Sequence, residues 1–147
     1  MADFVYNEAK RALASGELDF TSDDIRVLLV MTNTTADTED DVNTFAGFST
    51  LDEFDGSNYS SGGVALTGEA VNEDAGNNRA EFDANNATFS SIGAGTRQIQ
   101  ACIVYKWITN LNSSLPIAYI DSGGFPISAN GGDLTIQWNA EGILNFT

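Results

Sequence analysis

Apolar and polar residues follow a strand-like pattern in two widely separated segments of the chain. In IRVLLVM (residues 25–31), every second residue from Ile25 is apolar, and Leu28 and Val30 add apolar residues on the opposite face. A strand that is apolar on both faces is covered on both sides, so we expect this one to lie inside a sheet. In DLTIQW (residues 133–138), apolar and polar residues alternate strictly, which predicts a half-buried strand near the end of the chain.

Further strand patterns recur at short spacing, separated by residues that favour turns. The predicted strands cover residues 64–71, 79–84, 87–92, 96–107 and 115–121, and a pair formed by residues 134–139 and 143–147 closes the chain. Six to eight short strands of this kind are typical of all-β domains. The pattern therefore predicts a mainly β fold: a single-domain β-sandwich or jelly-roll-like barrel with one N-terminal α-helix.

The N-terminal segment has the period of a helix instead. In DFVYNEAKRALAS (residues 3–15), apolar residues gather on one face, and charged residues lie on the other. Asp3 can cap the start of this helix, and Gly16 is a typical residue at its end. We expect one domain spanning residues 1–147, with an N-terminal helix or arm (1–16), a long loop (33–63) and a β-rich core (64–147).

The predicted loop at residues 33–63 is acidic and contains isolated aromatic residues. A loop of this length is uncommon in a small domain, so it is either functional or shaped by a partner. Its rings can fold back over the sheet, or they can pack into a neighbouring subunit, since aromatic side chains often anchor interfaces. The residues predicted to lie at subunit contacts, two of them near the N-terminus, are Phe4, Tyr6, Phe45, Phe48 and Phe54.

Charge narrows the range of partners. The 147 residues include 21 Asp and Glu but 6 Lys and Arg, which gives a formal net charge of -15. Such a surface repels phosphate groups, so we expect neither nucleic acid nor an anionic membrane as a partner. The first residues lack the basic and apolar regions of a secretory signal, and none is expected. The single cysteine, Cys102, lies in an apolar run and is predicted to be buried and inert.

Catalytic and metal-binding residues are scarce. The chain has no histidine, so the commonest general base and the commonest metal ligand are both missing. The acidic runs DTEDD (37–41), LDEFDG (51–56) and NEDAG (72–76) can offer oxygen ligands to calcium, but none has the spacing of a calcium-binding loop. A pair of carboxylates for glycoside hydrolysis can arise by chance among so many acids. We therefore expect no enzyme activity and no cofactor.

Several ordered segments together resemble a known family. They are the opening helix, the strand DDIRVLLV, and the segments NYSSGGVAL, RAEFDANNATFSS, ACIVYK, LPIAYIDSGG and GDLTIQWNAEGILNFT. In this order they resemble a group of small virion structural proteins of tailed bacteriophages, over essentially the whole chain. The TFAGFSTLDEFDGS stretch is longer than the family pattern.

The resemblance implies a virion component without a catalytic residue. Some members of the group are head decoration or cement proteins, which clamp the outside of an icosahedral shell, often as trimers. It therefore implies a homo-oligomer, with a trimer favoured, that binds the major capsid protein on the capsid exterior. The absence of disulfide bonds agrees with assembly in the bacterial cytoplasm.

Two other functions fit the residues. One is a tail, neck or baseplate component of the same virion. The other is a β-sandwich carbohydrate-binding or adhesion module, because sugars stack on aromatic planes. Exposure of Trp107 or Trp138 would favour this second alternative, and burial of both would remove its main support.

Overall fold

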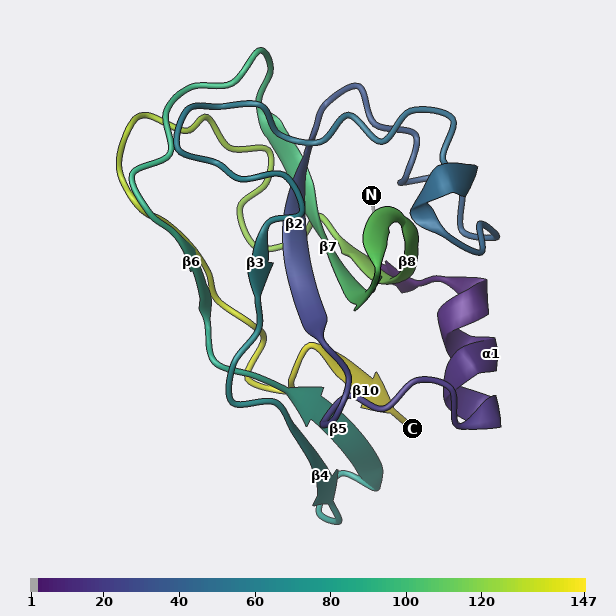
Figure 1. Cartoon of the computed structure of the whole chain (residues 1–147). Helices are drawn as coiled ribbons and strands as arrows, with labels where there is room; N and C mark the ends of the chain where they lie inside the picture. Colours follow the sequence, from purple (N-terminus) through teal and green to yellow (C-terminus); the bar gives the residue numbers. More distant parts are fainter. Residues whose placement is uncertain (1–2) are drawn as a thin grey trace.

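The computed structural model describes residues 3–147 and is mainly β (Figure 1). Its strands form a five-stranded sheet in the order β1-β8-β7-β2-β3, a three-stranded sheet β10-β5-β4 and a two-stranded sheet β6-β9. The pairs within these sheets are antiparallel, and one short helix, α1, lies near the N-terminus. The predicted mainly β class with an N-terminal helix is confirmed, but the sheets do not close into a barrel.

The five-stranded sheet contains most of the core. Its strands are β1 (Phe4–Val5), β2 (Ile25–Met31), β3 (Val64–Ala65), β7 (Ile99–Ile108) and β8 (Asn110–Ile120). As predicted, β2 lies inside the sheet, and all of its residues except Arg26 are buried. Strand β7 pairs with β2 from Ile25↔Lys106 to Met31↔Ile99, so two long apolar strands form the centre of the molecule.

The smaller sheets lie beside the large one. They comprise β4 (Ala70–Asp74), β5 (Arg79–Asp83) and β10 (Leu144–Phe146), and β6 (Ala87–Phe89) with β9 (Leu134–Ile136). The hairpin of β4 and β5 projects at the lower end of the view in Figure 1. Phe82 of β5 stacks on Phe20, with ring centroids 4.1 Å apart, and both rings are buried. This contact fastens the three-stranded sheet to the core, and β5 in turn pairs with β10 near the C-terminus.

The helix is shorter than the pattern predicts. Helix α1 spans Asn7–Ser15, and Gly16 ends it in the left-handed conformation at φ 76°, as expected. Asp3 is not its cap. The carboxylate of Asp3 instead accepts hydrogen bonds from the backbone N–H groups of Asp121 and Ser122, at 3.0 and 3.1 Å. Residues 4–5 pair with β8 instead of entering the helix, and Phe4 stacks on Tyr119.

Two predicted strands also have different limits. The predicted strand 64–71 is divided into β3 and β4, and Gly68 lies between them at φ 69°. The predicted turn after residue 107 is taken up largely into β8, which begins at Asn110. There the buried hydroxyl of Ser114 accepts a hydrogen bond from the N–H of Ile108 and donates one to the carbonyl of Asn110. These bonds let the chain reverse with few residues outside the strands.

Candidate functional site

Residues 33–63 form an ordered layer over the sheet. Phe45, in the short 3-10 helix η1 (Phe45–Gly47), is 4% exposed and meets Tyr105 edge to face at 5.0 Å. Phe48 is 9% exposed and packs edge to face on Tyr6, and Phe54 is 3% exposed. Three rings of the loop thus fold back onto the chain's own core, which was one of the two interpretations of the pattern.

The two N-terminal aromatic residues also belong to this core. Tyr6 is fully buried, and its hydroxyl donates a hydrogen bond to the carbonyl of Ala36 at 2.8 Å. Phe4 is half-buried on the edge strand β1, between Tyr6 and Tyr119. Of the five residues predicted to lie at subunit contacts, Phe4 therefore has the most open environment. A contact of these rings with another subunit stays a prediction.

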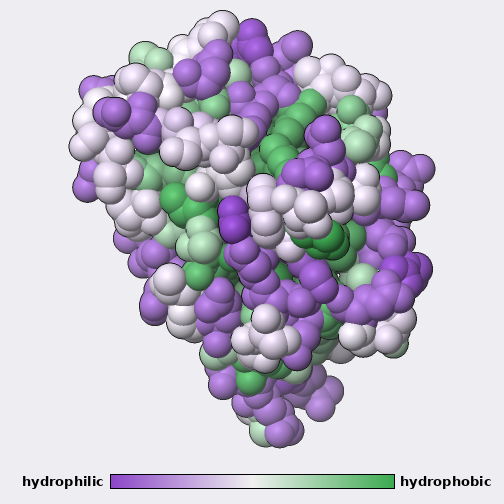
Figure 2. Space-filling model, in the orientation of Figure 1, coloured by the Kyte–Doolittle hydropathy of each residue, from purple (hydrophilic) through white to green (hydrophobic). Residues whose placement is uncertain are grey.

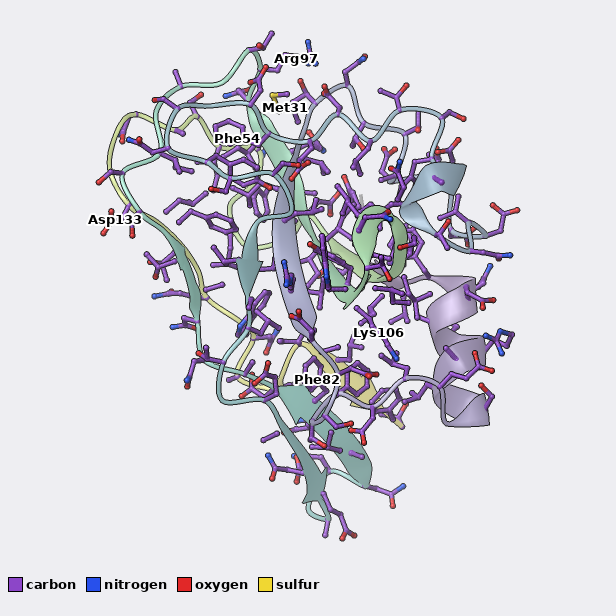
Figure 3. All side chains as sticks on the ribbon, viewed as in Figure 1. Met31, Phe54, Phe82, Arg97, Lys106 and Asp133 are labelled. Carbon is purple, nitrogen blue, oxygen red and sulfur yellow. The ribbon has the colours of Figure 1, made fainter. Side chains whose placement is uncertain are left out.

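Acidic side chains fasten the loop at its far end. Glu53 accepts hydrogen bonds from the Tyr59 hydroxyl at 2.9 Å, from the Ser61 hydroxyl at 2.7 Å and from the backbone N–H of Gly62. Asp52 pairs with Arg97, and Asp55 accepts hydrogen bonds from Thr96. Figure 3 shows Arg97, Met31 and Phe54 at this same end of the molecule. The carboxylates at this end of the loop thus form hydrogen bonds or an ion pair within the chain.

Glu39 has a similar role at the near end of the loop. Its carboxylate accepts hydrogen bonds from the hydroxyl and backbone N–H of Ser49 and from the hydroxyl of Thr35. The bonds from Ser49 and then from Thr35 hold the pKa of the Glu39 carboxyl below its usual range, because they stabilise its charged form. Within residues 3–147, no group of three or more His, Cys, Asp and Glu side chains is arranged to hold a metal ion.

Most of the cations are neutralised by partners within the chain. Five of the six Lys and Arg side chains form ion pairs with carboxylates among the described residues; they are Arg11, Arg26, Arg79, Arg97 and Lys106. Lys106 of β7 bonds to Asp23 at 2.8 Å and lies on the side of the sheet that carries α1 (Figure 3). A partner therefore meets few free cations on this surface.

Other carboxylates have no such partner. Asp37, Asp40, Asp41, Glu69 and Glu73 accept no side-chain hydrogen bond and form no ion pair within the described part of the chain. Three of these five lie together in sequence in the acidic loop. The face drawn in Figure 2 is covered mostly by hydrophilic residues, with apolar residues visible in separate patches. The surface thus carries a negative charge that its own cations do not balance.

The two tryptophans differ in their surroundings, although both are half-buried. The ring of Trp107 is covered on one side by the guanidinium of Arg26, whose Cζ lies 4.2 Å from the ring centroid. Trp138 lines a hollow of about 390 Å³ between the end of β8, the 122–127 segment and β9. Exposure of Trp107 or Trp138 was the condition for a sugar site in the sequence, and both are only partly exposed. Nothing in the sequence pointed to Phe125, which lines the same hollow from a segment without a strand pattern.

Cys102 lies on β7 and is fully buried. Burial raises the pKa of its thiol to about 12, because the apolar surroundings disfavour the thiolate. The prediction that Cys102 is buried is confirmed.

No helix in residues 3–147 combines the length and the apolar character that crossing a membrane requires. Comparison of the chain with protein-family models, with curated proteins and with solved structures finds no match.

Proposed function

We propose that this chain is a non-enzymatic structural protein of a tailed bacteriophage virion, and that it decorates the head shell from outside as a cement protein. The observation that carries the proposal is the charge: the formal net charge is -15, and five of the six cations are already paired within the chain. The β-sandwich packing that the resemblance implies is part of this proposal.

The charge supports a position on the exterior. Packaged DNA presents a dense array of phosphates to the inner face of a shell, and like charges repel at close range. A partner that binds this surface must bring its own Lys and Arg residues, because the chain offers few free cations. The partner we propose is the major capsid protein, with no contact to nucleic acid or membrane.

The proposed mechanism is additive clamping. A homo-oligomer, with a trimer favoured, bridges neighbouring capsomers of the expanded shell after assembly in the host cytoplasm. Binding only to the expanded state stabilises that state by mass action. Interfaces of standard size, about 1,600 Å² each, supply this stabilisation when they are repeated over the shell.

Copy number tests the location. Quantitative mass spectrometry of purified virions measures this chain against the major capsid protein. We expect a fixed ratio that corresponds to hundreds of copies per particle. A ratio of a few per cent would contradict head decoration and favour the alternative, a tail, neck or baseplate component.

A second experiment tests the clamping itself. Heads stripped of this protein are heated beside intact heads, and DNA release is followed by dye fluorescence. We expect stripped heads to release DNA at a lower temperature and to recover when purified protein is added back. Equal release temperatures would refute clamping even if the copy number were high.

A further inference from the structure

The hollow beside Trp138 continues into a second one. The second hollow, of about 320 Å³, lies between β1, the end of β8 and the segment before β10. Asp3, Ile120, Asn139 and Ile143 line both, so the two form one groove along the molecule. Each part has a volume within the range of roughly 300–1,000 Å³ that is usual for small-ligand sites. The groove has room for a ligand longer than a single ring.

The indole of Trp138 is held in place from behind. Its Nε1–H donates a hydrogen bond to the carbonyl of Asn85 at 3.0 Å, and its backbone N–H donates one to Oδ1 of Asn86 at 3.3 Å. The polar atom of the ring is therefore satisfied within the chain, and its carbon surface lines the hollow. A ring fixed before binding loses little freedom when a ligand stacks on it.

Neutral polar groups lie around this ring. Gln137 is exposed, and its side-chain amide makes no hydrogen bond within the described residues. Oδ1 of Asn139 accepts from the N–H of Glu141 at 3.0 Å, which leaves its amide N–H groups to donate elsewhere. The half-buried ring of Phe125 lines the same hollow. The groove thus combines aromatic carbon surfaces with amide donors and acceptors.

Charge restricts the ligand further. Asp3 is the one charged side chain that lines either hollow among residues 3–147, and no Lys or Arg does so. The Asp3 carboxylate already accepts three hydrogen bonds, from the N–H of Asp121 and from the N–H and hydroxyl of Ser122. An anionic ligand would find no Lys or Arg side chain in the groove among residues 3–147 and would be repelled by the net charge. The lining instead suits a neutral ligand with many hydroxyl groups.

We propose that this groove binds a neutral oligosaccharide. Trp138 supplies the surface on which a sugar ring stacks by its C–H face, and the amides of Gln137 and Asn139 hydrogen-bond its hydroxyls. The site is independent of the proposed clamping role, since it requires neither a trimer nor a capsid partner. A virion protein with such a site would hold the particle on a glycan-bearing surface.

The experiment is a titration of the full chain with neutral and acidic oligosaccharides. Binding is followed by amide chemical shifts in the nuclear magnetic resonance spectrum. We expect neutral oligosaccharides of hexoses or N-acetylhexosamines to shift amides of residues 120–127 and 135–143, and sialylated or sulfated ones to bind more weakly. Trp138→Ala should lower the affinity roughly tenfold or more. Trp107→Ala, the matched control, should leave it unchanged.

Two further variants separate binding from folding. Gln137→Ala changes an exposed side chain and should weaken binding while the spectrum stays that of the folded protein. Trp138→Phe keeps an aromatic face and should retain part of the affinity. The proposal is overturned if no neutral oligosaccharide shifts these amides, if acidic ones bind equally well, or if an extended peptide occupies the groove where sugars fail. A failure here would leave the copy-number result for the virion untouched.

Discussion

Gly63 shows how closely the loop approaches the central sheet. It has φ 69°, and a Cβ added there would lie 1.9 Å from the carbonyl oxygen of Val27 and 2.7 Å from Cα of Leu28. Both obstacles are backbone atoms of β2, which cannot rotate away. The position therefore excludes every other residue by sterics as well as by conformation.

We expect Gly63→Ala to lower the free energy of unfolding by about 3 kcal/mol or more, because strain and overpacking act together. Gly131→Ala is the matched control, since Gly131 also has positive φ (93°) but nothing lies within 4 Å of its added Cβ. Gly131→Ala should lower the free energy of unfolding by about 1 kcal/mol. Urea denaturation of the three proteins measures both values. Equal losses would mean that β2 can move away from residue 63.

Glu39 makes the loop sensitive to acid. Its pKa is depressed in the folded chain, so its contribution to stability is complete above the unfolded value of about 4.3 and is lost as pH falls through the folded pKa. We expect the free energy of unfolding to fall less steeply below about pH 5 in Glu39→Gln than in the wild type. Urea denaturation over a pH series measures the slopes. Equal slopes in Glu39→Gln and the wild type would contradict this role of Glu39.

Two residues at the ends of the predicted helix show which features the sequence predicts and which it does not. Gly16 was predicted correctly as the end of α1, because a left-handed cap depends on local conformation alone. Asp3 was predicted wrongly as its start, since its actual partners, Asp121 and Ser122, lie more than a hundred residues away along the chain. The choice between a local cap and this distant contact depends on the packing of Phe4 against Tyr119, which no local pattern reveals.

At the scale of elements, the stack of Phe82 on Phe20 is the closer of two aromatic contacts that join the three-stranded sheet to Phe20; the other is Phe20 with Phe146, at 6.3 Å. Phe82 is fully buried against Phe20, whereas Phe146 on the neighbouring β10 is 36% exposed. We expect Phe82→Ala to cost about 3–5 kcal/mol and to speed amide hydrogen exchange in β4, β5 and β10 before the rest of the molecule. Phe146→Ala should cost about 1 kcal/mol or less. Uniform acceleration across all sheets would contradict a separately anchored element.

The long apolar strands were the easiest elements to predict. Strands β2 and β7 match the expected segments closely, because each is apolar on both faces and so carries a strong signal. The loop at 33–63 was predicted only as irregular. Its order comes from contacts such as Tyr59 to Glu53 and Arg97 to Asp52, which involve side chains that also occur on solvated surfaces. The sequence alone does not show whether such a side chain bonds within the chain or faces solvent.

Only part of the candidate groove was predictable from the sequence. Trp138 was one of two tryptophans whose exposure would favour a sugar site, but the groove also needs Phe125, Asn139 and the N-terminal Asp3. These residues come from a loop, a turn and the position just before the edge strand β1, and they meet only in the folded chain. The composition showed that histidine is missing, but only the fold shows that an aromatic ring and neutral amides gather in one groove.

At the scale of the whole molecule, the proposed function predicts that the net charge governs encounter with a head shell. We expect the rate at which the protein associates with stripped heads to fall as sodium chloride is raised, because salt screens long-range attraction. Asp40→Asn with Asp41→Asn should slow association at low salt, since both side chains are exposed and unpaired. Stopped-flow light scattering follows the rates.

Lys10→Gln gives the control of opposite sign. Lys10 forms no ion pair with a carboxylate of the described chain, so removing its charge makes the molecule more negative with little loss of structure. Association should then become faster. If neither salt nor these substitutions changed the association rate, the shell surface would not be basic at the site where the protein binds.

The loop that covers β2 has a consequence for solubility at high density. Beyond the short β3, the outer edge of β2 is occupied by residues 52–54: Met31 donates a hydrogen bond to the carbonyl of Asp52, and Phe54 donates one to that of Leu29. A bare strand edge is a template for another chain. By occupying this edge with its own backbone, the molecule prevents its most apolar strand from recruiting copies of itself. Copies crowded side by side would then remain separate folded units and would not fuse into a growing fibre.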